Sequence, residues 1–250
     1  GAPLRIDRVE LSLNTATGVG GGIFVAPGGQ LYSDYVPEDF PRFADNRAAD
    51  GRSIFYDGSV ISFLRSGSFV GHQPSVGSAI VTVTGGAQLN ARGLTFSGNH
   101  GTALVAVDGA GSGVLLRNAS IAGNDMSGLV HSRDGISNVV VLASAVDETE
   151  RLFMVGEPAL SALPAVSTLP VFDCVVTRHA SSLSGMPPGT DLSGVLIADP
   201  RFVSPATGDL HVYAGSPVVD RCSGMPGSDG SDFDGQGRGR DDLAAPHPPR

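Results

Sequence analysis

The amino-acid sequence predicts an all-β protein, namely a right-handed parallel β-helix with about 25 residues in each coil. Three observations predict this fold. Glycine and proline are abundant, and a short apolar segment recurs at a fixed interval. Within each copy of this segment, the alternation of apolar and polar residues shifts by one residue at the same position. The chain has 250 residues, of which 35 are Gly and 17 are Pro. Turn signals are therefore frequent, as in all-β proteins. Apolar runs stay well short of the roughly 18 residues of a membrane-spanning helix, so no such segment is expected.

The repeat is clearest in two segments that align without gaps, residues 89–99 and residues 114–124, at an offset of 25 residues. A further step of 25 residues reaches residues 139–146, and a step of 27 residues backward reaches residues 64–72. Internal repetition at this period is typical of a solenoid, in which each coil packs only against its neighbours.

The apolar residues within each copy indicate where the chain turns. Leu89 and Ala91 alternate with polar residues, and the alternation resumes after a step of three at Leu94 and Phe96. Because strand side chains have a period of two, this step predicts a two-residue corner that keeps both flanks facing inward. The predicted first corners are Arg92-Gly93, Arg117-Asn118 and Leu142-Ala143. Gly and Asn at these places tolerate a left-handed backbone. Second corners are predicted at Gly98-Asn99 and Gly123-Asn124, after the strand that follows.

A third strand completes each coil and is expected at residues 79–83, 103–107 and 128–131. Chain chirality favours right-handed winding of such units. The whole chain, 1–250, is therefore interpreted as one domain. Its predicted parts are first strands and a cap (1–29), an inserted loop rich in Pro and aromatic residues (30–52), repeat coils (53–178), C-terminal coils with a cap (179–238) and a flexible tail (239–250).

The C-terminal part carries a series of short motifs. They read Asp199-Pro200-Arg201-Phe202, Gly208-Asp209-Leu210, Gly215-Ser216-Pro217-Val218-Val219-Asp220 and Asp232-Phe233-Asp234-Gly235. This series resembles the end of pectate-lyase-like, right-handed β-helix repeat proteins of bacterial surfaces. The resemblance implies the same fold and a C-terminal region that closes the helix. The final residues, 239–250, depart from the acidic ending usual in that group.

Charge and cysteine content narrow the function classes. The net charge is −9, and all 16 basic residues are Arg. An acidic protein is a poor partner for nucleic acid, and the absence of Lys excludes Schiff-base and P-loop chemistry. The two cysteines, Cys174 and Cys222, form no CxxC motif. They are interpreted either as one disulfide of an oxidising compartment or as two buried thiols.

Arg65, Arg92 and Arg117 occupy equivalent first corners of successive coils. We expect them to stack about 4.8 Å apart, which is the strand spacing. One interpretation is a docking stripe for an acidic polysaccharide, with guanidinium groups that pair with carboxylates or sulfates. The alternative is a solvated edge, on which Arg stems cover apolar surface.

Two weaker candidate sites remain. Asp229, Asp232 and Asp234 have the oxygen-ligand density of a Ca²⁺ loop, although Asp and Gly also simply form turns. His72 and His100 follow corners 28 residues apart, and a base near the Arg column would suit proton abstraction beside a uronate carboxylate. Solvated corner histidines are the alternative.

These observations favour a secreted or cell-surface module without catalytic activity that binds acidic glycans and requires no cofactor. One alternative is a polysaccharide lyase or related enzyme acting on acidic polysaccharides. A third is a structural spacer of a longer adhesin.

Overall fold

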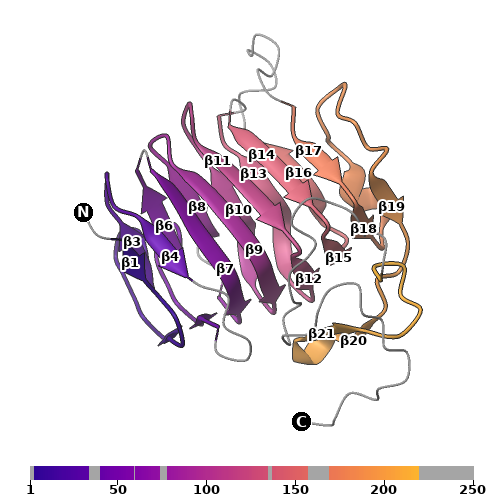
Figure 1. Cartoon of the computed structure of the whole chain (residues 1–250), viewed down its shortest axis with the longest axis horizontal. Coiled ribbons are helices and arrows are strands. Elements are labelled where there is room, and N and C mark those ends of the chain that lie inside the picture. Colours follow the sequence, from indigo (N-terminus) through magenta and orange to yellow (C-terminus); the bar gives the residue numbers. More distant parts are fainter. Residues whose placement is uncertain are drawn as a thin grey trace.

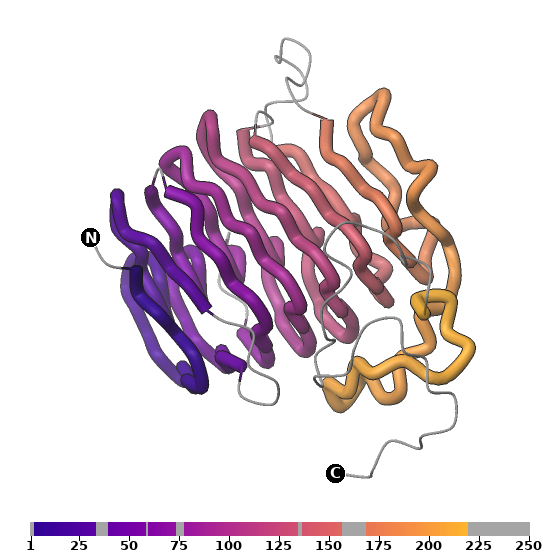
Figure 2. The backbone as a smooth tube through the Cα atoms, in the orientation of Figure 1, coloured from indigo at the N-terminus to yellow at the C-terminus, as the bar shows by residue number. Residues whose placement is uncertain are grey.

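The computed structural model describes residues 3–33, 40–58, 60–73, 78–134, 137–156 and 169–219. Over these ranges the chain winds as a parallel β-helix, which confirms the predicted fold (Figures 1 and 2). Within the coils, each strand pairs in parallel with the equivalent strand of the next coil, and only the hairpin of β20 and β21 is antiparallel among the described strands. The predicted spacing of 25 residues is confirmed by the register, which aligns Gln88 with Gly113 and Gly113 with Asn138. Among the described helices, none is long and apolar enough to cross a membrane.

The strands form three rows along the helix axis. The first row contains β1 (Leu4–Arg5), β4 (Leu31–Ser33), β11 (Gly113–Arg117), β14 (Asn138–Leu142) and β17 (Val171–Asp173). The second contains β2 (Glu10–Ser12), β5 (Arg42–Ala44), β12 (Ser120–Ala122), β15 (Ala145–Asp147), β18 (Val175–Thr177) and β19 (Val195–Ile197). Two long strands, β7 (Ile61–Val70) and β9 (Gln88–Ser97), run through the corner and belong to both rows.

The third row is a separate six-stranded sheet. It consists of β3 (Ile23–Val25), β6 (Ile54–Asp57), β8 (Ala79–Thr84), β10 (His100–Val107), β13 (Asp125–Ser132) and β16 (Arg151–Val155). The third strands predicted at residues 79–83, 103–107 and 128–131 lie within β8, β10 and β13.

The first corners lie where the parity of apolar residues predicts them. Gly93, Asn118 and Ala143 have φ angles of 64°, 54° and 49°, so each takes the left-handed conformation. Asn tolerates this backbone, whereas Ala143 adopts it at a steric cost. At the second corners the left-handed residues are Gly98 and Gly123, with φ of 63° and 70°. The Asn that follows each of these glycines has a different role, described below.

The interior is a column of stacked apolar side chains. Phe43, Phe69 and Phe96 occupy one register position in successive coils, and their ring centroids are 4.8 and 4.9 Å apart. All three rings are fully buried. Offset stacking of aromatic rings at this distance adds to the free energy gained from burying them.

Phe43 shows that residues 30–52 are not the inserted loop expected from the sequence. The described parts, residues 30–33 and 40–52, belong to the second coil, which contains β4, β5 and the start of the connection to β6. Eight residues lie between Ser33 and Arg42, whereas three lie between their partners Leu64 and Ser68. Only a short insertion at the first corner therefore disturbs this coil, and it hides the repeat from a search at constant spacing.

A ladder of buried polar side chains follows the second corners. Its buried rungs are Asn46, His72, Asn99, Asn124 and Glu148. At the N-terminal end the exposed Asn14 joins the ladder, since its Nδ2 donates to Asn46 Oδ1 at 2.9 Å. Asn99 shows the pattern: its Oδ1 accepts hydrogen bonds from the backbone N–H and the ring Nδ1 of His72, and its Nδ2 donates to the Phe69 carbonyl at 2.9 Å. The same Nδ2 also donates to Asn124 Oδ1 at 2.8 Å. Each rung thus satisfies buried backbone groups at a corner, where strand pairing is interrupted.

The C-terminal segment lies against the side of the coils. Strands β20 (Phe202–Ser204) and β21 (Asp209–Val212) form an antiparallel hairpin through the 3₁₀ turn η2 (Pro205–Thr207). Phe202 and Leu210 pack on Ala122 and Ala145, which face outward from β12 and β15. The hairpin lies beside β12 (Figure 1). This hairpin contains the first two motifs of the C-terminal series. It covers a lateral face, whereas the resemblance implied that the region closes the end of the helix.

Cys174, at the corner between β17 and β18, is disulfide-bonded. The sequence offers one other cysteine, Cys222, which lies outside the described residues. Cys174 itself is buried and has a φ of 56°.

The ladder predicts a large energetic difference between two asparagines of the same coil. We expect Asn99→Ala to lower the free energy of unfolding by about 2–4 kcal/mol, because it leaves buried groups of neighbouring coils without their partners. Asn90→Ala, on the outward side of β9, should change it by less than about 1 kcal/mol. Urea denaturation of both variants measures the difference, and equal losses would contradict a structural role for the ladder.

Candidate functional site: an outer arginine column

Arg65, Arg92 and Arg117 are aligned in consecutive strands, because the register pairs Arg65 with Arg92 and Arg92 with Arg117. They face outward, since the flanking Leu64, Ala91 and Leu116 are buried in the core. Arg65 is exposed, while the other two are half-buried. The expected column of three guanidinium side chains is therefore present on the outer face of the first strand row.

A second outward row runs beside this column. It contains Arg5, Tyr32, Phe63, Asn90 and Leu115 in register. The rings of Tyr32 and Phe63 lie edge to face, with centroids 6.5 Å apart. The Arg65 guanidinium lies 5.9 Å from the Tyr32 centroid and 6.0 Å from that of Phe63. This cation–π arrangement holds the first Arg of the column against an aromatic surface.

The charge along the Arg column changes toward the C-terminal coils. Beyond Arg117 the aligned residues are Leu142 and then Asp173. A cleft of about 400 Å³ opens there, and Asp173, Asp191 and Gly194 are among its lining residues. The outer face thus passes from cationic and aromatic, through apolar, to acidic within a few coils.

Several other arginines are engaged by carboxylates of this chain. Arg133 makes a bidentate ion pair with Asp50, whose pKa is lowered mainly because this pairing outweighs burial. Arg178 contacts Asp147 at 3.1 Å, and Arg42 contacts Glu10 at 2.6 Å. These pairs lie away from the Arg column and neutralise their own charges locally.

The two candidate histidines occupy different environments. His72 is fully buried as a rung of the ladder: its Nδ1–H donates to Asn99 Oδ1 at 2.8 Å, and its Nε2 accepts from the Ser53 hydroxyl at 2.5 Å. His100 lies on the outside, 3.3 Å from Asp125. The ladder places Asn99, rather than His100, at the position equivalent to His72. The structure therefore brings neither the two rings together nor a base to the Arg column.

Burial lowers the pKa of His72 to about 4, and the nearby charge of Arg52 adds to this effect, while the hydrogen bond to Asn99 opposes it. A ring that stays neutral and shielded from solvent is suited to holding two coils together. It is poorly placed to take a proton from a bound ligand.

The acidic residues proposed as a Ca²⁺ loop, Asp229, Asp232 and Asp234, lie outside the described residues. Across the ranges that the structure does describe, no group of three or more His, Cys, Asp or Glu side chains converges as a metal site. The Ca²⁺ hypothesis stays a prediction.

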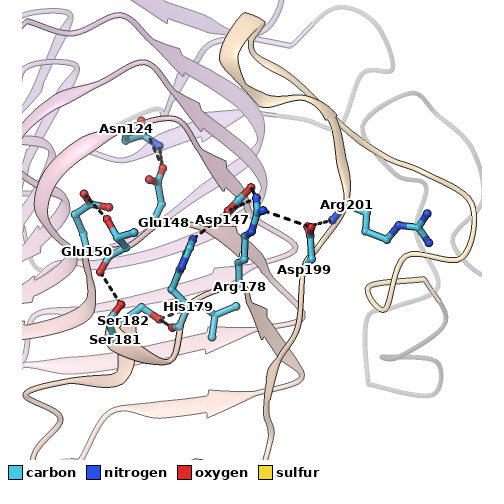
Figure 3. A network of polar contacts seen from close by, with 12 residues as sticks. Asn124, Asp147, Glu148, Glu150, Arg178, His179, Ser181, Ser182, Asp199 and Arg201 are labelled. Atoms are coloured by element: carbon cyan, nitrogen blue, oxygen red, sulfur yellow. Dashed lines mark hydrogen bonds and ion pairs between the residues drawn. The ribbon is translucent and has the colours of Figure 1, made fainter.

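A charged network that the sequence did not reveal surrounds the turn between β15 and β16 (Figure 3). Asp147 contacts Arg178 at 3.1 Å and His179 Nε2 at 3.5 Å, and Arg178 also reaches Asp199 at 3.8 Å. On the inner side of the same turn, Glu148 accepts hydrogen bonds from the backbone N–H and the Nδ2 of Asn124. The network links the ladder to the segment that leads into the C-terminal hairpin.

Two residues of these sites, Tyr32 and Glu148, lie at repeat positions that the sequence alone could indicate. Tyr32 lies in the part of the chain interpreted as a loop, and that interpretation does not predict its alignment with Phe63. Glu148 follows Asn124 by 24 residues, close to the repeat length, but the change from amide to acid hides it as a rung.

The chain was compared with protein families, curated proteins and solved structures. No protein-family model matches the chain, no curated protein is significantly similar to it, and no solved structure matches it.

The His72 environment makes a prediction about acid sensitivity. Because its folded-state pKa of about 4 lies below the ordinary value of 6.5, its contribution to stability is complete above 6.5 and is lost as the pH falls toward 4. We expect His72→Asn, which keeps an amide rung, to reduce the loss of stability over this window. Urea denaturation at several pH values measures the effect. An NMR titration that found the His72 ring protonated at about pH 6 would contradict the assignment.

Proposed function

We propose that this protein is an extracellular or cell-surface β-helix module that binds acidic polysaccharides on the outer face of its first strand row. The observation that carries the proposal is the in-register column of Arg65, Arg92 and Arg117 beside the aromatic pair Tyr32 and Phe63.

The chemistry of the column suits a regularly charged polymer. Three guanidinium side chains at strand spacing, about 4.8 Å, form a row of like charges that anions laid along it would stabilise. Arg also pairs with carboxylates and sulfates through two parallel hydrogen bonds. A polyanion laid across the strands would supply such groups to each Arg in turn.

The aromatic row supports a sugar-containing ligand. Tyr32 and Phe63 offer apolar ring surface next to a cation, and Asn90 adds an amide that can donate and accept hydrogen bonds. A glycan carries both apolar ring faces and polar edges, so this mixture suits it better than a uniformly charged face would.

The net charge of −9 restricts such binding to this part of the surface, because polyanions are repelled elsewhere. The disulfide bond of Cys174 supports an oxidising, extracellular location, since disulfides are rare in reducing compartments.

The proposal is tested with the double variant Arg92→Gln/Arg117→Gln. We expect its affinity for polygalacturonate, alginate or a glycosaminoglycan to fall at least about tenfold, or about 1.4 kcal/mol. The wild-type affinity should decrease as salt is added. Affinity electrophoresis or calorimetry measures both effects.

The matched control is Arg42→Gln/Arg47→Gln. It removes the same charge from two exposed arginines that lie outside the column. The affinity of this control for the polysaccharide should change less than about threefold, because neither arginine belongs to the column and exposed charges interact only weakly with a ligand bound elsewhere. Equal losses in both double variants, or binding that is unchanged in the first, would exclude the column as the binding site.

The polysaccharide-lyase hypothesis makes a separate prediction, which is an increase in ultraviolet absorbance as unsaturated uronate forms. Because neither His72 nor His100 reaches the Arg column, we expect a flat trace with pectate, alginate and glycosaminoglycans. A rising trace that depends on Arg92 would replace the binding proposal with a catalytic one. If the protein is only a spacer, it will show neither binding nor product.

A further inference from the structure

The last rung of the buried ladder differs from the others in its chemistry. Asn46, Asn99 and Asn124 each present an oxygen that accepts and an N–H group that donates. Glu148 occupies the next position and accepts from Asn124 through Oε1, at 2.8 and 2.7 Å. Only 5% of Glu148 is exposed.

The missing donor matters because of where the asparagine amides point. Asn99 Nδ2 donates to the Phe69 carbonyl, and Asn124 Nδ2 donates to the Phe96 carbonyl. In the register the next residue of this series is Ile121. An ionised carboxylate has no hydrogen to donate at this rung, whereas a protonated carboxyl has one.

From this arrangement we propose that the turn Glu148–Glu150 is a pH-sensitive latch, closed when Glu148 is protonated and loosened when it ionises. Closed, it completes the ladder. Loosened, it places a buried negative charge at the end of the ladder and beside a second carboxylate, Glu150.

The surroundings favour the protonated form near neutral pH. Burial is the main cause that raises the pKa of Glu148 to about 7, and the negative charge of Glu150 raises it further, while the hydrogen bonds from Asn124 oppose the shift. On the outer side of the turn, Arg178 and His179 both contact Asp147 (Figure 3).

Opening of the turn would spread to the elements docked on it. Ser181, in η1 (Ala180–Leu183), donates to the Thr149 carbonyl at 3.4 Å. Arg178 links Asp147 to Asp199, just before the C-terminal hairpin. The latch thus connects the ladder in the interior to the segment that covers the side of the coils.

The direction of the pH dependence follows from linkage. Because the folded-state pKa of Glu148 lies above its ordinary value of 4.5, this residue favours the folded state increasingly as the pH falls from 7 to 4.5 and disfavours it above 7. His72 acts in the opposite direction over part of this range. The contribution of Glu148 must therefore be read as a difference between variant and wild type at each pH.

The deciding variant is Glu148→Gln, which keeps the acceptor, supplies a permanent donor and cannot ionise. We expect it to raise Tm by roughly 4–8 °C relative to wild type at about pH 8.5, with the difference shrinking toward zero at about pH 5. Hydrogen exchange of residues 145–156 and 178–183, corrected for the intrinsic rate, should rise above pH 7 in the wild type and not in the variant.

Two further variants keep the experiment decisive. Glu150→Gln removes the neighbouring charge and should move the midpoint of the wild-type transition to lower pH without abolishing it. The control variant Glu10→Gln removes an exposed carboxylate far along the chain from this turn, and it should leave the transition unchanged. The latch is overturned if the difference between Glu148→Gln and wild type is the same at both pH values, or if Glu10→Gln has an equal effect.

Discussion

In the described coils from Asn46 to Glu148, the side chain directly after the second corner hydrogen-bonds to a neighbouring coil from inside the molecule. Strand pairing cannot satisfy the backbone at these corners, and a buried carbonyl or N–H without a partner costs about as much as a lost hydrogen bond. Asn99 illustrates the solution, because one amide serves His72, the Phe69 carbonyl and Asn124 together. A shift of register by one residue would break all of these contacts at once.

The outer surface depends on this inner constraint. The same register that stacks Phe43, Phe69 and Phe96 inside also aligns Arg65, Arg92 and Arg117 outside. Mutual repulsion in such a column opposes folding slightly, so the ladder and the apolar core must hold it in place. An acidic protein can in this way present a compact cationic stripe, which is the basis of the proposed glycan binding.

Much of the fold could be predicted because the residues that mark corners and the apolar residues that face the core recur in each coil. Gly93 and Asn118 mark the left-handed corners, and the alternation of Leu89 and Ala91 marks the inward face. The second coil escaped recognition, since a short insertion changes its spacing and its aromatic residues are typical of a loop. The bridging role of Asn99 and Asn124 does not follow from the sequence, because an Asn beside a corner glycine is equally typical of a turn.

The candidate site could be predicted only where it follows directly from the repeat. The Arg column lies at one repeat position, but the contribution of Tyr32 and the burial of His72 depend on which residue of each coil faces inward. The Glu148 rung is harder still, because its chemistry is set by Asn124 and Glu150 in three dimensions.

NMR tests most directly whether an anionic glycan binds along the outer column of arginines that the strand register aligns. The backbone amides are assigned, and their shifts are followed as a short acidic oligosaccharide, such as an oligogalacturonate, is added. The account predicts that the perturbed amides trace one line across consecutive strands through Arg65, Arg92 and Arg117, with Tyr32 and Phe63 beside it. Perturbations gathered on another face, or none at saturating oligosaccharide, would contradict it.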